Sequence, residues 1–346
     1  MRALVVRRYG SPEVFESRQV PDPQPKPGEV LIRVKAIGVN FADLMQRMGI
    51  YPGTPKPPFV PGLEIAGVVE KVADDPGKRG DGEVLQPGDA VMAMPHFGAY
   101  AEWVSVPVGS VHRIPPAMPF DVAAAFAVSY LTAYHAMFTM GNLQPGHRIL
   151  IHGAAGGVGI AAVQLARAKG LVTFGTAGSL KQEFLRKIGV DHPIDYEKSD
   201  FVKTVRQFAP DGIEMVMDPI GGSSLARGQK CLGPTGRLVV YGLSDATGTT
   251  GKRNPMRMLR ALLQTPRFHP LKLMEQNIAV IGVSLGSPGT RFGALLRAEL
   301  KEVGRMYEAG KLKPVIAKTF PLDQAAAAHQ FIHDRKNIGK VILSVR

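Results

Sequence analysis

The 346-residue sequence predicts an α/β protein in which a doubly wound parallel sheet is joined to a second, β-rich part. Its length favours two domains, because one hydrophobic core rarely serves so long a chain. From about residue 123 onward, short apolar runs alternate with helical segments, a pattern typical of a parallel sheet covered by helices on both faces. The residues before that point carry apolar-alternating runs separated by Pro and Gly, which indicate strands without intervening helices.

The first part is expected to contain four strands separated by turns. Each is a short apolar-alternating run bounded by Pro, Gly or a polar cluster. The predicted strands span residues 3–6, 29–36, 64–72 and 90–93. Residues 74–83 are polar and rich in glycine, which predicts a surface loop between the last two strands.

The rest of the chain is expected to alternate strands with helices. The predicted strands span residues 148–152, 171–175, 213–217, 237–241, 278–283 and 340–345. The predicted helices cover 122–138, the stretch from the glycine-rich turn after residue 152 to residue 169, 179–188 and the region around 325–328. Gly189 should end the third of these, because glycine adopts the left-handed conformation found at helix C-termini. Polar residues interrupt 122–138, so this segment is expected to be a buried helix and not a membrane span.

A glycine cluster, Gly153-Ala-Ala-Gly-Gly-Val-Gly159, lies where the strand ending at His152 turns into a helix. In the pattern G-x-G-x-x-G, Ala154 takes the first glycine position, Gly156 the second and Gly159 the third. Gly156 has no Cβ, so a pyrophosphate can approach the backbone, and Gly159 lets the helix pack closely on the strand. The unpaired N–H groups of the helix N-terminus attract phosphates. This strand–turn–helix context predicts a dinucleotide-binding Rossmann domain.

The absence of an acidic residue after this cluster favours NADPH over NADH. A site for NAD usually has Asp or Glu ~20 residues further on, where it accepts a hydrogen bond from the ribose 2′-hydroxyl. Residues 160–182 contain neither. Ser179 and Lys181 follow the second strand and are candidates to bind a 2′-phosphate, although Lys181 is equally compatible with a solvated helix position.

The chain is strongly basic. Its 42 Lys and Arg against 29 Asp and Glu give a net charge of +13, which favours anionic partners such as phosphorylated cofactors, thioesters of coenzyme A or acidic lipid. A solvated basic surface explains the excess equally well. No nucleic-acid recognition motif accompanies it, so we expect no nucleic-acid partner. Segment 252–272 concentrates the charge: it has no acidic residue, its Met and Leu residues are interleaved with bases, and its six bases are Lys252, Arg253, Arg257, Arg260, Arg267 and Lys272. It is suited to an anionic ligand tail or a membrane surface, or it caps a helical insertion.

Cysteine content and the N-terminus predict a cytoplasmic protein. Cys231 is the single cysteine, which excludes an internal disulfide and every Cys-rich zinc motif. This fits a reducing compartment. Charges at Arg2, Arg7 and Arg8 leave only a short apolar stretch between them, so no secretory signal is expected.

The sequence resembles the zinc-free quinone oxidoreductases of the medium-chain dehydrogenase/reductase family over essentially its whole length. The segments that carry the resemblance are Asn40-Phe-Ala-Asp43, Pro61-Gly-Leu-Glu-Ile-Ala-Gly67, Gln86-Pro-Gly-Asp89, Gly98-Ala-Tyr-Ala-Glu102, Gly153 to Gly159 and Asn337-Ile-Gly-Lys340. Within that group it resembles in particular the vesicle amine transport protein homologues. The shared stretches are Gly141-Asn-Leu-Gln-Pro-Gly-His147, His192-Pro-Ile-Asp-Tyr196, Met217-Asp-Pro-Ile-Gly-Gly222 and Gly251-Lys-Arg-Asn254.

This resemblance implies a divided catalytic domain of the GroES-like type, residues 1–123 and 287–346, with the NADP-binding Rossmann domain, residues 124–286, inserted between. It implies a cleft in which the candidate cofactor-binding residues are Asp43, Thr132, Gly156, Gly157, Val158, Ser179, Lys181, Tyr196, Tyr241, Gly242, Leu243 and Asn337. Asn40 and Asp43 would border the nicotinamide, and Ser179, Lys181 and Tyr196 would surround the 2′-phosphate. The family also implies a homodimer, formed by edge pairing of the strand near 278–283.

Two departures from the wider family bear on the chemistry. The Gly-His-Glu of zinc alcohol dehydrogenases is Gly62-Leu63-Glu64 here, and Asn40 stands where the first ligand cysteine would be. Leucine cannot ligate zinc, and the four-cysteine structural lobe is absent, so we expect no metal. Met45 occupies a position where quinone oxidoreductases often have tyrosine, whereas Tyr51 is retained.

Without zinc, hydride transfer suits small, electron-poor substrates that spread negative charge unaided. Quinones, enones and enoyl thioesters such as enoyl-CoA are of this kind. Asn40 is a candidate hydrogen-bond donor to a developing enolate, and Tyr51 is a candidate proton source. Alternatively, Asn40 only caps a turn and Tyr51 is only a packed loop residue. His96, His135 and His152 show neither a nucleophile pattern nor metal-ligand spacing, and His152 is expected to be buried. The alternative function is a non-enzymatic cofactor-binding protein associated with membranes or partners.

Overall fold

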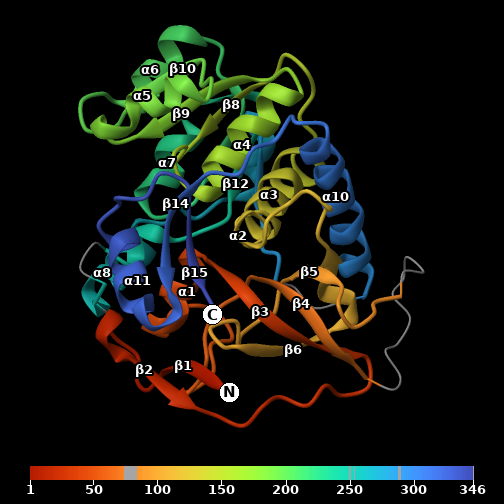
Figure 1. Ribbon diagram of the computed structural model, residues 1–346. Coiled ribbons are helices and arrows are strands. Elements are labelled where there is room, and N and C mark those ends of the chain that lie inside the picture. The colour runs from red at the N-terminus through yellow and green to blue at the C-terminus, as the bar shows by residue number, and fades with distance from the viewer. Residues whose placement is uncertain (74–83, 249–250, 253, 287–289, 346) are drawn as a thin grey trace.

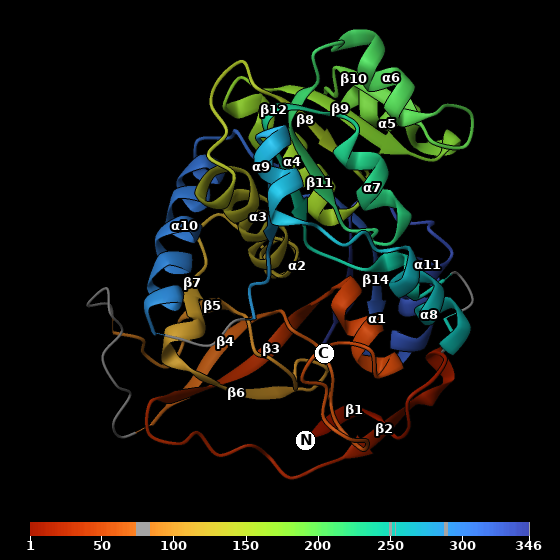
Figure 2. The same ribbon diagram turned by 180° about the vertical axis from the view of Figure 1, so that it is seen from behind.

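The structure is a computed structural model of the chain that describes residues 1–73, 84–248, 251–252, 254–286 and 290–345. The predicted loop at 74–83 therefore lies outside the described residues, as does Arg253. Figures 1 and 2 show two β-sheets, one above the other, with helices covering the upper sheet and packing between the two.

The upper sheet is a six-stranded parallel sheet with the order β10-β9-β8-β11-β12-β13. Its strands are β8 (Arg148–Ile151), β9 (Val172–Ala177), β10 (His192–Asp195), β11 (Ile213–Asp218), β12 (Leu232–Val240) and β13 (Ala279–Gly282). The chain starts in the middle and winds outward in both directions, which is the doubly wound arrangement of a Rossmann domain. Its helices include α4 (Gly157–Ala168), α5 (Gln182–Lys187), α6 (Phe201–Phe208) and α7 (Ser223–Gln229). The predicted α/β fold class is confirmed.

The lower sheet brings the two ends of the chain together. Its order is β14-β15-β3-β4-β5-β7, and β6 also pairs with β3. The strands are β3 (Glu29–Val39), β4 (Ile65–Val72), β5 (Ala90–Ala93), β6 (Trp103–Pro107), β7 (Val111–Arg113), β14 (Ile316–Pro321) and β15 (Lys340–Ser344). Strand β15 is antiparallel to β3, so the C-terminal segment completes the N-terminal sheet. The domain boundaries at 123 and 287 stay a prediction. A separate pair, β1 (Arg2–Val6) and β2 (Phe15–Gln19), flanks this sheet.

The helical segments differ most from the sequence prediction. The single helix expected over 122–138 is wrong: the chain forms α2 (Phe120–Ala124), α3 (Ala127–Tyr134) and a π-helical turn (His135–Met140). A largely apolar run does not mark such breaks, because most residues of these helices are buried or partly buried and leave no clear helical period. Helix α10 (Thr290–Glu308) had no sequence prediction. It packs against α3 and makes the upper wall of the molecule on that side. Helices α8 (Pro255–Gln264), α9 (Pro270–Gln276) and α11 (Ala325–His333) complete the chain, with α1 (Phe41–Met48) after β3.

One apolar cluster continues from the lower sheet into the upper domain. It includes Ala36 and Ala66 of β3 and β4, Phe126 before α3, and Ala161 of α4, all of which are buried. The two sheets therefore share packing on this side. The space that remains between them, beside the carboxyl ends of the parallel strands, is the cleft described next; ligands bind at this edge of doubly wound sheets.

Candidate active site

The glycine cluster forms a turn that leads from β8 into α4. Gly153 has φ = +65°, a left-handed conformation that glycine adopts without strain. Gly156 is the N-cap of α4. A Cβ on Gly159 would collide with the Gly153 carbonyl and lie 2.6 Å from the Ala154 Cα, so the absence of a side chain lets α4 pack closely on the turn that follows β8. The turn leaves the helix N-terminus facing the cleft, where its N–H groups are available to a pyrophosphate.

A cleft of about 1110 Å³ runs between the two sheets and holds most of the predicted site. The predicted residues that line it are Asn40, Tyr51, Thr132, Gly156, Gly157, Val158, Lys181, Tyr196, Tyr241, Gly242, Leu243 and Asn337. They come from the two ends of α1, from α3 and α4, from the ends of β9, β10 and β12, and from the segment before β15. Segments more than 300 residues apart in sequence thus face one space.

Two predicted residues lie outside this lining. Asp43 is fully buried behind the wall, where its Oδ2 accepts a hydrogen bond from the Asn40 backbone N–H at 2.9 Å and one from the Tyr100 hydroxyl at 3.1 Å. Burial raises the pKa of the Asp43 carboxyl to about 7. Ser179 turns away from the cleft, and its hydroxyl donates to Asp195 Oδ2 at 2.6 Å. Its backbone N–H donates to Glu197 Oε2 at 3.1 Å.

One end of the cleft carries a pair of cations. Lys181 Nζ donates to the Asn337 carbonyl at 2.6 Å, and Arg335 Nη1 approaches the Tyr196 hydroxyl at 3.5 Å. Burial and then the neighbouring charge of Arg335 lower the pKa of Lys181. An anion such as a 2′-phosphate would be stabilised by both side chains. The sequence prediction missed Arg335; its φ of +56°, uncommon for a residue with a side chain, becomes visible only in the structure.

At the centre of the cleft, Asn40 belongs to a buried network with Glu64 and Lys340. Lys340 Nζ donates to Asn40 Oδ1 at 2.6 Å and to Glu64 Oε2 at 2.7 Å, and the Lys340 and Glu64 side chains are 6% and 0% exposed. Asn40 Nδ2 donates to Glu64 Oε2 at 3.0 Å and to the Gly38 carbonyl at 3.1 Å. Both amide hydrogens of Asn40 are therefore engaged, so as placed it offers no free donor to a substrate.

The same network ties the two domains together. Glu64 Oε1 accepts the Val128 N–H at 2.8 Å near the start of α3. Just before Lys340, the Gly339 N–H donates to the Ala155 carbonyl in the glycine turn at 2.9 Å. The lysine stem also runs beside Gly157, whose Cβ would lie 3.4 Å from Lys340 Cδ. The position of the glycine turn is thus coupled to the wall that carries Asn40.

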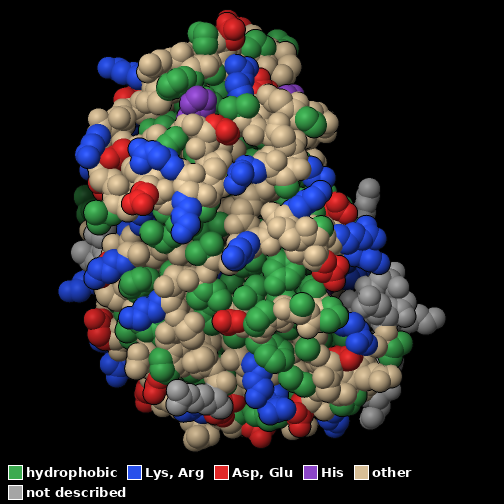
Figure 3. Space-filling view, turned by 45° about the horizontal axis from the view of Figure 1, so that its top comes forward, with side chains coloured by type: hydrophobic (Ala, Val, Ile, Leu, Met, Phe, Trp, Pro, Cys, Tyr) green, Lys and Arg blue, Asp and Glu red, His purple; other side chains and the backbone are tan. Residues whose placement is uncertain are grey.

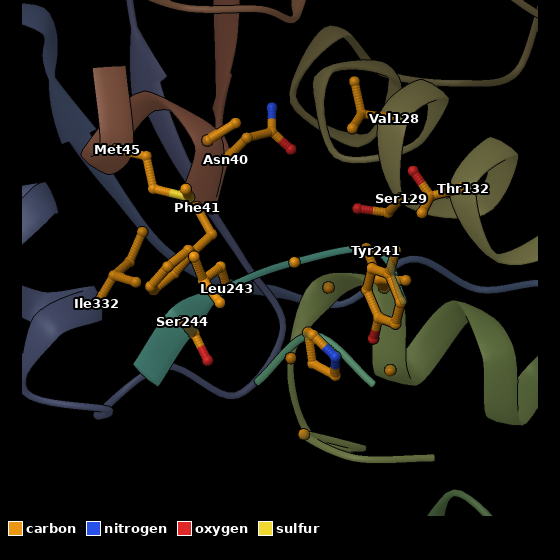
Figure 4. Close-up of a pocket in the computed structure, with 18 of the residues that line it drawn as sticks. Asn40, Phe41, Met45, Val128, Ser129, Thr132, Tyr241, Leu243, Ser244 and Ile332 are labelled. Carbon is orange, nitrogen blue, oxygen red and sulfur yellow. The ribbon is translucent and has the colours of Figure 1, made fainter. Parts of the chain in front are cut away.

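Hydroxyl groups line the next part of the cleft. Ser129 and Thr132 project from α3 on the same side, facing Tyr241 at the end of β12 (Figure 4). Burial raises the pKa of Tyr241, so it remains a neutral phenol. Phe41, Met45, Leu243 and Ile332 gather on the other side of the same view and make it apolar. Met45, the departure from the family pattern, belongs to this apolar side.

The remaining end is formed by loops and α10. Tyr51, His96 and Phe292 line it together with Leu285 and Leu296. Burial raises the pKa of Tyr51. His152, at the opposite side of the glycine turn, is buried as expected, and its Nδ1 lies 3.0 Å from Thr176 Oγ1. Its Nε2 has no hydrogen-bond partner among the described residues, so it is only partly satisfied.

The basic segment forms α8 and α9 on the outside of the molecule. Arg257 is paired with Asp245 at 3.0 Å. Large apolar side chains are exposed beside the remaining bases: Met256, Leu259, Leu262, Leu263, Leu271 and Met274. Of the helices in the described part of the chain, none is both long and apolar enough to span a membrane. On the face shown in Figure 3, Lys and Arg are scattered among acidic and neutral groups and do not form one continuous patch.

Comparison with known proteins identifies the class of this fold and site. Residues 26–116 match the alcohol dehydrogenase GroES-like domain, and residues 188–343 match the model described as zinc-binding dehydrogenase. The synaptic vesicle membrane protein VAT-1 homolog of Mus musculus is 41% identical over 99% of this chain and 83% of its own length. Human quinone oxidoreductase is 32% identical over 99% and 97%. The chain therefore belongs to the medium-chain dehydrogenase/reductase family.

Within that family the chain is of the zinc-free quinone oxidoreductase type and stands near the VAT-1 homologues, as its motifs predicted. The structure of Escherichia coli quinone oxidoreductase complexed with NADPH superposes with a TM-score of 0.86 at 27% identity and covers all of both chains.

The zinc named by one family description does not fit the residues present. Leu63 has no donor atom, and Asn40 Oδ1 and Glu64 Oε2 already accept hydrogen bonds from the Lys340 ammonium. A metal ion would have to displace or lie beside that fixed positive charge, with no thiolate or imidazole to bind it. Across the described residues, no group of three His, Cys, Asp or Glu has the geometry to hold a metal.

Proposed function

We propose that this protein is an NADPH-dependent, zinc-independent oxidoreductase that reduces an activated C=C bond or a quinone. The observation that carries the proposal is the polarity of one continuous cleft. A glycine turn and two cations lie at one end, and an apolar chamber with a phenol at the other. This is the arrangement needed to hold a long anionic cofactor against a neutral, electron-poor substrate.

The cofactor proposal rests on the residues at the cationic end. The glycine turn and the N-terminus of α4 would bind the pyrophosphate, and Lys181 and Arg335 the 2′-phosphate, with Tyr196 beside them. The solved relative from Escherichia coli holds NADPH. When bound, NADPH supplies a hydride. Thr132 and Tyr241 to Leu243 would then hold the reacting end in the centre of the cleft.

The substrate proposal rests on what the central network offers. Glu64 neutralises Lys340, and Asn40 is held by both, so this wall orients a substrate and does not polarise a ketone as a Lewis acid would. Substrates that delocalise the negative charge themselves fit such a wall. Tyr51, which stays protonated at neutral pH, is the proposed proton donor, and Asn40 is a fixed part of the binding surface.

The test is a binding and turnover experiment. NADPH and NADH are titrated against the protein by fluorescence. Oxidation of the tighter cofactor is then followed with a naphthoquinone, cyclohexenone and crotonyl-CoA as separate probes. Tight NADPH binding with turnover of at least one probe supports the proposal. If neither cofactor binds, or if NADH binds more tightly than NADPH, the cofactor assignment is wrong.

An enoyl-CoA substrate is a narrower version of this proposal. Arg260, Arg267 and Lys272 are exposed, whereas Arg257 is held by Asp245. Neutralising the three exposed bases should slow reduction of crotonyl-CoA and leave cyclohexenone unaffected, because only the thioester carries phosphates. Equal loss on both substrates would contradict the thioester assignment.

A second candidate function is favoured by α8 and α9. Exposed Met and Leu side chains lie there among bases with no acidic residue up to Lys272, a composition suited to an anionic membrane surface. Flotation with vesicles containing phosphatidylserine tests it. Salt-sensitive binding that is lost on replacing Leu262 and Leu263 with Ser, without any turnover, would favour a membrane-associated cofactor-binding protein.

We also propose that the protein forms a homodimer and is located in the cytoplasm. Strand β13 is the edge of the upper sheet, and an exposed edge pairs readily with a second copy, which would give a homodimer. Size measurement by light scattering tests this. A lone buried cysteine fits a reducing cytoplasm.

A further inference from the structure

Three polar side chains from distant parts of the chain meet around Gly286 at the apolar end of the cleft. A Cβ built on Gly286 would lie 3.6 Å from the Tyr51 hydroxyl, 3.8 Å from His96 Cε1 and 3.8 Å from Ser284 Oγ. The three side chains therefore surround one small space, and Gly286 leaves it open. His96, Tyr51, Ser284 and Gly286 all line the cleft.

Several apolar side chains lie near this cluster. Pro52, Met94, Leu285 and Phe292 line the same end. A polar group in such surroundings normally finds a partner. Yet among the described residues neither the Tyr51 hydroxyl nor the His96 ring has a hydrogen-bond partner. Both groups are thus left available to a molecule in the cleft or to each other.

The backbone under both side chains is fixed. The His96 carbonyl accepts a hydrogen bond from Gln46 Nε2 at 3.3 Å, and Gln46 is fully buried. The Tyr51 carbonyl accepts one from the Thr54 hydroxyl at 2.6 Å. The two side chains consequently approach the cleft from anchored positions, as a preorganised site requires.

The two residues differ in their access to water. His96 is exposed, whereas Tyr51 is half-buried. Protons can therefore reach the imidazole from solvent while the phenol faces the substrate chamber. The other ionisable groups near this end are His112, Asp43 behind Tyr51, and Arg297, which donates to the Gly109 carbonyl.

We propose that His96 resupplies Tyr51 with the proton that Tyr51 gives to the reduced substrate. This inference rests on the proposed function. Hydride addition to an enone or enoyl thioester forms a new C–H bond and leaves an enolate, and hydride addition to a quinone leaves a hydroquinone monoanion. Tyr51 donates its O–H proton to that anion, the phenolate takes a proton from the His96 imidazolium, and His96 is protonated again from solvent. One NADPH and one proton are consumed for each substrate reduced.

The test compares His96→Gln and His96→Ala with His147→Ala, a histidine outside the cleft. Turnover of the best probe from the cofactor experiment is measured against pH, with and without added imidazole. We expect the His96 variants to lose roughly ten- to hundredfold in kcat, the range of a general-acid contribution, with the KM for NADPH unchanged. The fall in wild-type kcat at high pH should disappear in His96→Gln. Imidazole should restore His96→Ala in part and leave His147→Ala unaffected.

The outcomes separate this inference from the proposed function. If wild-type protein binds NADPH but reduces no probe, both are overturned. If wild type turns over and His96→Gln keeps its rate and pH profile, only the role of His96 is wrong. A loss in His96→Ala that imidazole does not reverse, with unchanged pH dependence, would indicate a structural role and would also overturn the proposal.

Discussion

The two ends of the cleft are built in different ways. At the cofactor end, the glycine turn and α4 are consecutive in sequence and follow directly from one strand. At the substrate end, Tyr51, His96 and Phe292 come from three separated segments. At the first end, the side chains of Lys181 and Asn337 both donate to backbone carbonyls. At the second end, neither the Tyr51 phenol nor the His96 imidazole has a hydrogen-bond partner within the described part of the chain.

This difference follows from what each end must recognise. Every nicotinamide dinucleotide carries the same pyrophosphate, and a fixed glycine turn at a helix N-terminus suits such a constant group. Substrates vary, and loops can vary with them while the scaffold stays unchanged. The two ends are joined by the network of Asn40, Glu64 and Lys340. This network fixes the position of one end relative to the other.

Breaking that junction should have the largest effect. Lys340→Met leaves the buried Glu64 carboxylate without its cation, and such a change costs about 3–5 kcal/mol of unfolding free energy. Urea unfolding measures it. The double variant Glu64→Gln with Lys340→Met should recover much of the loss, because no buried charge then remains. Failure of the double variant to recover would mean that packing of the lysine stem, and not charge pairing, dominates.

The cationic end should determine which cofactor is preferred. In Lys181→Ala and Arg335→Ala, the ratio of NADPH to NADH affinity should fall by about ten- to hundredfold each, as for a charge-assisted hydrogen bond of about 1.5–3 kcal/mol. Fluorescence titration of both cofactors measures the ratio. Lys198→Ala, near Asp195 outside the cleft, is the matched control. Equal weakening of both cofactors would contradict a 2′-phosphate site.

A substitution in the glycine turn should have a smaller effect, on the affinity for NADPH alone. A Cβ on Gly156 would meet only the Gly153 carbonyl, at 3.3 Å, so Gly156→Ala should still fold. Its methyl group would occupy the approach of the pyrophosphate and raise the Kd for NADPH about tenfold, or about 1.4 kcal/mol. Binding and thermal unfolding are measured together. Unchanged affinity in a folded variant would indicate that the pyrophosphate lies elsewhere.

The smallest effect is expected at His333, which lines the cleft wall beside the buried Arg47. This residue lies 2.7 Å from the Arg47 guanidinium, and burial followed by that charge lowers its pKa to about 4. Because the folded pKa lies below that of a free imidazole, its stability contribution is complete above about pH 6.5 and is lost as the pH falls towards 4. Replacing His333 with Asn should flatten this decline by about 1 kcal/mol at pH 5. Urea unfolding at neutral pH and at pH 5 measures the free energy of unfolding of both proteins. If the variant loses as much stability on acidification as the wild type, other groups cause the decline.

Local sequence patterns predicted the glycine turn and five of the six strands of the upper sheet, but not β10. Alternation of apolar runs with helices and the spacing of Gly156 and Gly159 are visible within short windows, and the chain forms these elements with small shifts in their ends. The break between α2 and α3 was not predictable in this way, because most of these residues are buried or partly buried and leave no clear helical period.

For the candidate site, the sequence predicted some residues and missed or misplaced others. Lys181 was predicted from its place after the second strand and Tyr196 through the resemblance, but Arg335 reaches the same point only because β15 returns to the lower sheet. Ser179 was placed by proximity in sequence, whereas β10 brings Asp195 close enough to engage it. The network of Asn40, Glu64 and Lys340 spans 300 residues and depends on tertiary packing alone.

The most direct test of the central claim is turnover after complete removal of metal. Protein treated with a strong chelator and dialysed is mixed with NADPH and a quinone or enone, and oxidation of NADPH is compared with that of untreated protein and of protein supplied with zinc. We predict the same rate in all three, because Asn40 and Glu64 already accept hydrogen bonds from Lys340 and Leu63 has no donor atom for a metal. Loss of turnover on chelation that zinc restores would contradict the account.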